Sequence, residues 1–116
     1  MLSESDATKY IETYQSLSPN CIALHVADNS MEPLFYEDEV IIICPLAHGV
    51  YPQDRSFVVA KIDKDQFVLR RYLARRNNAF DLQAENEQFA TLSSASGGSV
   101  PEIVGVVVEH RKTHFL

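Results

Sequence analysis

The sequence predicts an all-β domain with a few short helical turns. Six short runs of apolar or alternating residues follow one another closely, and each run ends at a turn-forming stretch. Hydrophobic residues make up 46% of the 116 residues, which is enough for a single packed core. We therefore expect one compact β domain over residues 20–116, preceded by an N-terminal arm or short helix over residues 1–19.

The first three predicted strands cover residues 21–27, 40–44 and 57–62. In the first, Ile22, Leu24 and Val26 share one face, because successive side chains on a strand point to opposite sides. The run over 40–44 is apolar throughout, which indicates a strand that is buried on both faces.

The remaining predicted strands cover residues 66–73, 79–83 and 103–109. A polar turn at 63–65 predicts a hairpin between the third and fourth strands. The segment 75–78 is predicted as a basic turn, and the Gly- and Ser-rich segment 93–99 as a flexible loop. Before the first strand, Tyr10, Ile11, Tyr14 and Leu17 recur near helical spacing.

Charge and cysteine content restrict the class of protein. The formal net charge is −6, and an acidic domain is a poor binder of nucleic acid because phosphate contacts dominate that affinity. Cys21 and Cys44 lack the spacing of a zinc or thiol redox motif, so we expect two buried, reduced cysteines. The apolar runs fall short of the roughly 20 residues that span a bilayer, and the N-terminus shows no secretory pattern. These features predict a soluble cytoplasmic protein with no membrane partner.

The stretch that follows the first predicted strand is the candidate functional site. Asp28 and Asn29 favour a tight turn, because Asp bonds its own backbone and Asn tolerates left-handed backbone. Ser30 lies just past this turn, where its side chain can point into a cleft. Local chemistry alone favours the simpler interpretation, which is an ordinary boundary between a strand and a turn.

The motif Ser30-Met31-Glu32-Pro33 resembles the nucleophile motif of the LexA/signal-peptidase superfamily, most closely that of LexA-type repressors and UmuD. Further segments resemble the family's strands and turns in the same order; they are residues 38–43, 57–62, 67–72, 84–86 and 103–108. The resemblance covers roughly residues 20–111. It implies the β-clip fold of the LexA C-terminal domain.

The resemblance also implies a Ser-Lys dyad, in which a neutral lysine takes the proton of the serine. Ser30 occupies the serine position, but Arg70 occupies the position of the lysine. Arginine does not deprotonate in proteins, so Arg70 can hydrogen-bond Ser30 without acting as its base. Lys61 and Lys64 are nearby in sequence, but neither stands at the motif position.

Two other departures indicate a degenerate site. The family's Gly-Asp pair before the serine is replaced by Asp28-Asn29, which removes the backbone freedom of glycine. The chain also contains neither Ala-Gly nor Cys-Gly, the dipeptides that self-cleaving relatives cut.

The resemblance implies a regulatory and dimerisation domain of a phage-type or SOS-type transcriptional repressor. DNA would then be bound only through a separate or missing domain, and a RecA-like filament is a possible partner. Two alternatives stay open: an active self-cleaving serine peptidase with an unorthodox base, and a UmuD-like partner subunit. We expect a homodimer with residues 103–111 at or beside its interface, because an apolar terminal strand needs a cover, and Phe115 is a plausible anchor.

Other titratable residues receive simpler interpretations. His25 is predicted to be a half-exposed strand histidine rather than a base for Ser30. The acidic segment 37–39 is predicted to be a solvated turn, and His110 and His114 to belong to a polar tail without a third metal ligand. The arginines at 70, 71, 75 and 76 are expected to form local ion pairs rather than a nucleic-acid patch. We predict no metal and no cofactor.

Overall fold

The computed structural model describes residues 2–3, 20–47, 49–63, 66–95 and 98–111. Eight strands form one antiparallel sheet in the order β1-β2-β3-β8-β4-β5-β6-β7. The strands are β1 (Leu2–Ser3), β2 (Ile22–Val26), β3 (Val40–Cys44), β4 (Phe57–Lys61), β5 (Phe67–Ala74), β6 (Phe80–Gln83), β7 (Leu92–Ser93) and β8 (Glu102–Arg111). One short 3₁₀ turn, η1 (Arg76–Asn78), connects β5 to β6. The predicted all-β class is confirmed.

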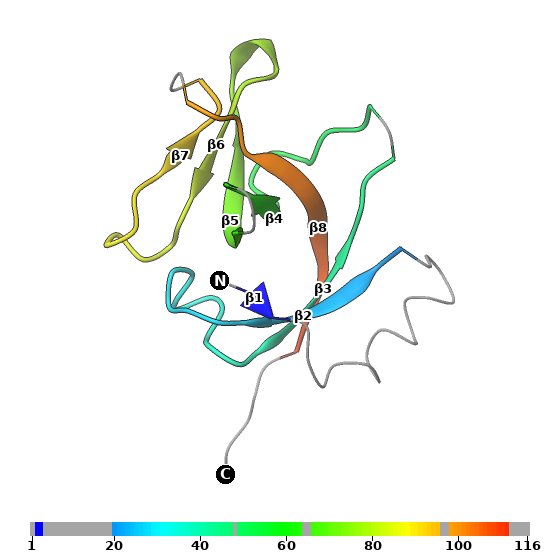
Figure 1. Ribbon diagram of the computed structural model, residues 1–116, viewed down its shortest axis with the longest axis vertical. Helices are drawn as coiled ribbons and strands as arrows, with labels where there is room; N and C mark the ends of the chain where they lie inside the picture. Colours follow the sequence, from blue (N-terminus) through cyan, green and yellow to red (C-terminus); the bar gives the residue numbers. More distant parts are fainter. Residues whose placement is uncertain (1, 4–19, 48, 64–65, 96–97, 112–116) are drawn as a thin grey trace.

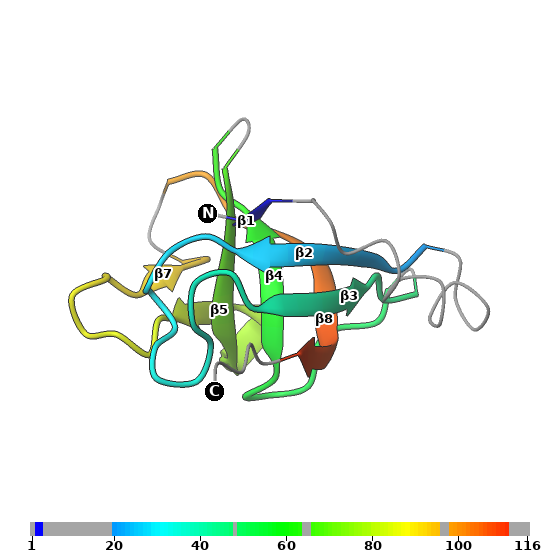
Figure 2. The same ribbon diagram turned by 90° about the horizontal axis from the view of Figure 1, so that it is seen from below.

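The sheet has two halves joined by β8. In Figure 1, β8 curves from the half that holds β4–β7 to the half that holds β1–β3. Figure 2 shows β2 and β3 running across the direction of β4 and β5. Val106 of β8 pairs with Cys44 of β3 and also with Val58 of β4, so the strand changes partner at this residue.

The largest core cluster lies between the two halves. Leu24, Val26 and Ile41 come from β2 and β3, whereas Val59 and Leu69 come from β4 and β5. A second cluster, which includes Val58, Val68 and Tyr72, covers the other face of β4–β6. The period-2 patterns of the sequence thus predict which residues share a face, because each face of a strand packs into a different cluster.

All six predicted strands are present, with small differences at their ends. The hairpin between β4 and β5 is confirmed by their antiparallel register, which runs from Phe57↔Arg71 to Lys61↔Phe67. Strands β1 and β7 are not predicted by the sequence, because two residues carry no readable periodicity. The predicted arm or helix over residues 1–19 lies outside the described residues, apart from the two residues of β1. No helix in the described part of the chain is long and apolar enough to cross a membrane.

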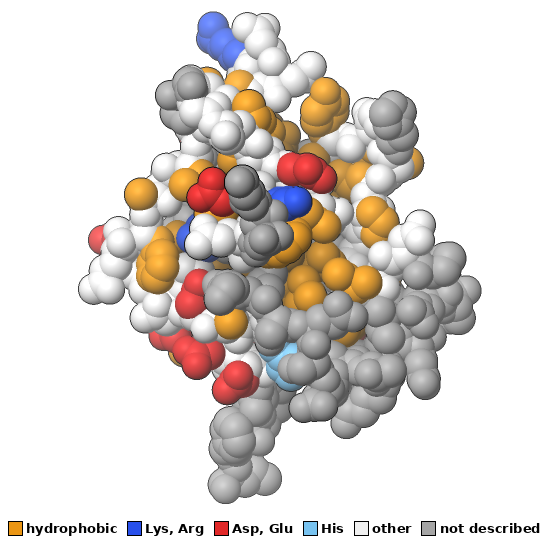
Figure 3. Space-filling view, viewed as in Figure 1, with side chains coloured by type: hydrophobic (Ala, Val, Ile, Leu, Met, Phe, Trp, Pro, Cys, Tyr) orange, Lys and Arg blue, Asp and Glu red, His pale blue; other side chains and the backbone are white. Residues whose placement is uncertain are grey.

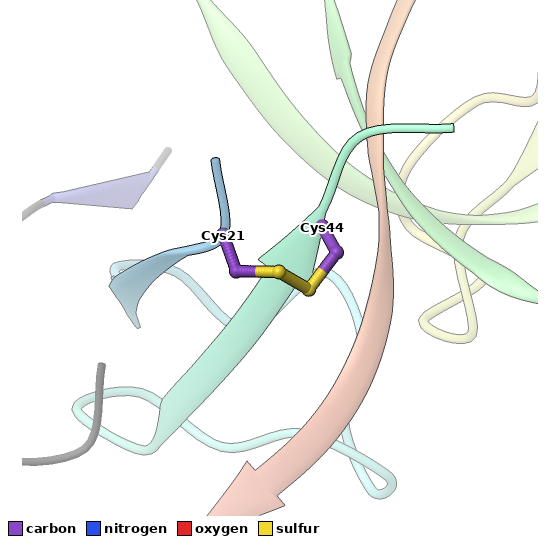
Figure 4. The surroundings of a disulfide bond; sticks show 2 residues. All are labelled: Cys21 and Cys44. Atoms are coloured by element: carbon purple, nitrogen blue, oxygen red, sulfur yellow. A yellow bond between two sulfur atoms is a disulfide. The ribbon is translucent and has the colours of Figure 1, made fainter. Parts of the chain in front are cut away.

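The prediction of two reduced cysteines is wrong. Cys21 and Cys44 form a disulfide between the start of β2 and the end of β3 (Figure 4). The register explains the pairing: Ile22 lies opposite Ile43, which places the next residues outward, Cys21 and Cys44, opposite each other.

The cover that an apolar terminal strand needs is provided in part by the chain itself. β8 lies inside the sheet and pairs with β3 through Val106–Arg111 and with β4 through Glu102–Val106. Gly105 allows this arrangement, because a Cβ atom at this position would lie 3.1 Å from the backbone oxygen of Cys44. His110 and Arg111 belong to β8 rather than to a polar tail.

The disulfide leads to a stability prediction. It closes a loop with a sequence separation of 23 residues, so its reduction should lower the free energy of unfolding by about 3 kcal/mol. Urea denaturation with and without dithiothreitol measures this difference. The double variant Cys21→Ser/Cys44→Ser is the control and should be insensitive to the reductant. Alkylation of both thiols in unreduced, folded protein would contradict the disulfide.

Candidate functional site

The turn after β2 places Ser30 in the interior. The Oδ1 atom of Asp28 accepts hydrogen bonds from the backbone nitrogen of Ser30 at 3.0 Å and from its hydroxyl at 2.7 Å. This is the self-bonding Asp turn that the sequence predicts. Ser30 is only 2% exposed, so its hydroxyl depends on protein partners rather than on bulk water.

Arg70 reaches Ser30 from β5, in the other half of the sheet. Its Nη1 atom donates to the Ser30 hydroxyl oxygen at 2.9 Å and to the Leu69 carbonyl oxygen at 2.8 Å. The side chain is 6% exposed, and its guanidinium carbon lies 5.6 Å from the ring centroid of Phe89. The structure therefore brings together the two residues that the sequence aligns with a catalytic dyad, although they are 40 positions apart.

A third segment, between β6 and β7, holds the Ser30 turn from outside. The backbone nitrogen of Asn86 donates to the Ser30 carbonyl oxygen at 2.9 Å, and its side-chain amide donates to the Asn29 carbonyl oxygen at 3.1 Å. The sequence predicts a turn at Glu85-Asn86, through the likeness of residues 84–86 to the family's Pro-Glu-Asn turn. It does not predict that this turn contacts the segment around Ser30.

The electrostatics of the site leave Ser30 between a cation and an anion. Burial lowers the pKa of Arg70 below its usual value, and the nearby Asp28 carboxylate acts in the opposite direction. Burial alone would raise the pKa of Asp28, but hydrogen bonds that the carboxylate accepts, those from Ser30 among them, bring it below its ordinary value. Asp28 is thus a weak base, and Arg70 is a donor that holds its proton.

Other residues considered from the sequence lie elsewhere. His25 Nδ1 lies 3.3 Å from the Asp38 carbonyl oxygen, and its described contacts do not include Ser30. Lys61 is the last residue of β4 and pairs with Phe67, and its described contacts do not include Ser30. Lys64 and His114 lie outside the described residues. Within the described ranges, no three His, Cys, Asp or Glu side chains gather as metal ligands would.

Two of the remaining arginines form the ion pairs that the sequence predicts. Arg71 pairs with Glu85 at 2.6 Å, and Arg75 pairs with Asp81 at 3.0 Å. On the face drawn in Figure 3, acidic side chains are more prominent than basic ones. This surface is what an acidic domain is expected to show.

Glu39 corrects the prediction of a solvated acidic turn over residues 37–39. It is 4% exposed, and its Oε1 atom accepts from the Tyr36 backbone nitrogen at 2.7 Å. The same oxygen lies 2.7 Å from His110 Nε2 on β8. The His110 ring also packs on Phe35, with 4.3 Å between the ring centroids. Glu39 therefore ties the turn that follows Ser30 to the end of β8.

A cavity of about 260 Å³ adjoins the Ser30–Arg70 contact. Its polar lining residues are Asp28, Gln66 and Arg70, and its apolar lining residues are Phe67, Val68 and Phe89. Sequence reasoning missed Gln66 and Phe89, because only the folded chain brings them into one cavity with Asp28 and Arg70.

An all-β fold and a buried serine that is hydrogen-bonded to a basic residue of β5 form the arrangement that the resemblance to a serine peptidase domain predicts. Residues 2–108 match the family model described as Peptidase S24-like, and the chain belongs to this family. The chain is also similar to an uncharacterized HTH-type transcriptional regulator of Coxiella burnetii (strain RSA 493 / Nine Mile phase I). The two are 29% identical over 112 residues, which cover 97% of this chain and 50% of the regulator. The chain thus spans about half the length of the curated relative that it matches.

The buried position of Glu39 leads to a second prediction. Glu39→Ala removes the acceptor of the Tyr36 backbone nitrogen and of His110, and should lower the free energy of unfolding by about 1–3 kcal/mol. The matched control is Glu37→Ala in the same turn, where the side chain is exposed and the change should be near zero. Equal urea midpoints for the two variants would show that the Glu39 contacts do not contribute to stability.

Proposed function

We propose that this chain is the regulatory and dimerisation domain of a transcriptional repressor of the LexA type, with a self-cleavage site that has lost its base. The observation that carries the proposal is the 2.9 Å hydrogen bond from Arg70 to the Ser30 hydroxyl. In this geometry the family's lysine would remove the serine proton, but a guanidinium can only donate. The similarity to an HTH-type transcriptional regulator supports the regulatory role.

In this proposal DNA is bound by a separate domain. The regulator from Coxiella burnetii is about twice as long as the matched region, which leaves room for an HTH segment outside it. The net charge of −6 disfavours DNA contact by this domain itself. A RecA-like filament would be a partner only if it binds this domain without triggering cleavage.

A repressor acts in the cytoplasm, and we propose this location for the domain. The Cys21–Cys44 disulfide is the observation that weighs against it, because the cytosol keeps most thiols reduced. Cys21 is fully buried, so a reducing thiol has poor access to its sulfur atom.

The first test of the proposal is the absence of self-cleavage. Because Arg70 keeps its proton, the intact mass should stay unchanged during long incubation, even at alkaline pH where a lysine base would be neutral. Intact-mass spectrometry of the purified chain, and of a longer chain with its preceding segment, provides the measurement. Cleavage that Ser30→Ala abolishes would establish an active peptidase and overturn the proposal.

The second test concerns dimerisation through β8. Val108 is 47% exposed even though β8 lies inside the sheet, whereas Ile103, Val104 and Val107 pack against the two core clusters. We propose that a second copy covers the exposed surface around Val108 about a two-fold axis. Val106 is a poor probe, because it packs against the second core cluster.

Sedimentation at micromolar concentration should therefore show twice the monomer mass of 13.1 kDa. Val108→Glu should dissociate the dimer without unfolding it, because the new charge would be desolvated at the interface. The matched control is Val50→Glu in the β3–β4 connection, where the side chain is 54% exposed and the dimer should persist. A parent protein that sediments as a monomer at every concentration would remove the dimerisation role.

A further inference from the structure

The cavity beside Ser30 contains a cation whose hydrogen bonds are incomplete. Arg70 Nη1 has two acceptors, but its Nε atom is buried and has no hydrogen-bond partner among the described residues. A buried N–H group of a charged side chain is costly to leave without an acceptor. An oxygen atom of a bound ligand would satisfy it.

The lining of the cavity restricts the chemistry of that ligand. A guanidinium binds carboxylates and phosphates, because its planar donors match the paired oxygen atoms of both groups. Phe67, Val68 and Phe89 provide an apolar wall, which fits an apolar or aromatic ligand body. Asp28 lines the same cavity, and its carboxylate repels a doubly charged phosphate about twice as strongly as a singly charged carboxylate at the same distance.

The volume and position of the cavity fit a small ligand. At about 260 Å³, the cavity is below the range of roughly 300–1,000 Å³ that holds drug-sized molecules. It opens beside the first half of β5. On one side of β5, β4 pairs with Phe67–Arg71. On the other side, β6 pairs only with the part of β5 that begins at Arg71. The Phe67–Arg70 segment therefore lacks a second strand partner in the described part of the chain.

We propose that this cavity is a binding site for a small monocarboxylic acid with an apolar body, held by Arg70 and packed against Phe67, Val68 and Phe89. The proposal rests on the proposed function, in which the site does not cleave peptide bonds. The replacement of the base by arginine then has a second consequence, because it places a permanent positive charge in the cavity. The ligand binds to Arg70, whose hydrogen bond to the Ser30 hydroxyl connects the site to the turn that follows β2.

The experiment compares phenylacetate with its neutral isostere phenylacetamide and with inorganic phosphate. Binding to the intact protein is followed by calorimetry and by NMR shifts of the amides of residues 66–70 and 89. The acid should bind at least about tenfold more tightly than the amide, since a charge-assisted hydrogen bond is roughly twice as strong as a neutral one. Phosphate should bind more weakly than the acid.

Two variants locate the site. Arg70→Gln should remove the preference for the acid over the amide, and Phe89→Ala should weaken binding of both compounds. The control Arg75→Gln alters an exposed arginine outside the cavity and should leave binding unchanged. If Arg70→Gln fails to fold, the comparison of acid and amide on the parent protein still decides the matter.

Equal affinity for acid and amide would overturn the proposal, as would tighter binding of phosphate or shifts confined to other residues. No binding of the acid at about 10 mM would overturn it as well, because a Kd above that concentration is too weak for a specific site. An extended peptide that shifts residues 66–70 where the acid does not would assign the cavity to a polypeptide. Intact-mass spectra of the same samples separate the two proposals. Cleavage of the chain would contradict the proposed absence of self-cleavage. An uncut chain that binds no acid would contradict only the proposed ligand site.

Discussion

The change of partner along β8 is the constraint on which the site depends. At Val106 the strand is paired on both sides, and on either side of it β3 and β4 diverge. The ladders shift register between Ile42 and Ile43 and between Val59 and Ala60, as expected where a sheet bends sharply. Gly105 permits the backbone of Cys44 to pass closely over this bend. Without the bend, the two halves of the sheet would not face each other.

The functional site is a product of this bend, because its residues come from both halves. Ser30 follows β2 and Arg70 lies on β5, and the two strands are four positions apart in the sheet order. The core cluster between the halves fixes their separation, since Met31 next to the serine and Leu69 next to the arginine both belong to it. Packing of the apolar neighbours therefore positions the Ser30–Arg70 hydrogen bond. The hydrogen bond fixes the orientation of the two side chains, whereas apolar burial supplies most of the stability.

The sequence predicts the strands well because their patterns are local. Alternation at β2 and β5, and the apolar run at β3, can be read within a few residues. The pairing of Ser30 with Arg70 became predictable only through the family resemblance, because 40 residues separate them. The disulfide, the burial of Glu39 and the inner position of β8 were not predicted, since each depends on register between distant strands.

The structure needs the Ser30 hydroxyl for a reason that is separate from catalysis. Arg70 is a buried cation, and its burial is tolerated only where acceptors meet its donors. The Ser30 hydroxyl provides one such acceptor while donating to Asp28, so it relays a hydrogen bond between a cation and an anion that lie in different halves. Removal of the hydroxyl would leave both charged groups short of a partner. Ser30 is therefore required by the structure as the hydrogen-bonded link across the bend, independently of any nucleophilic role.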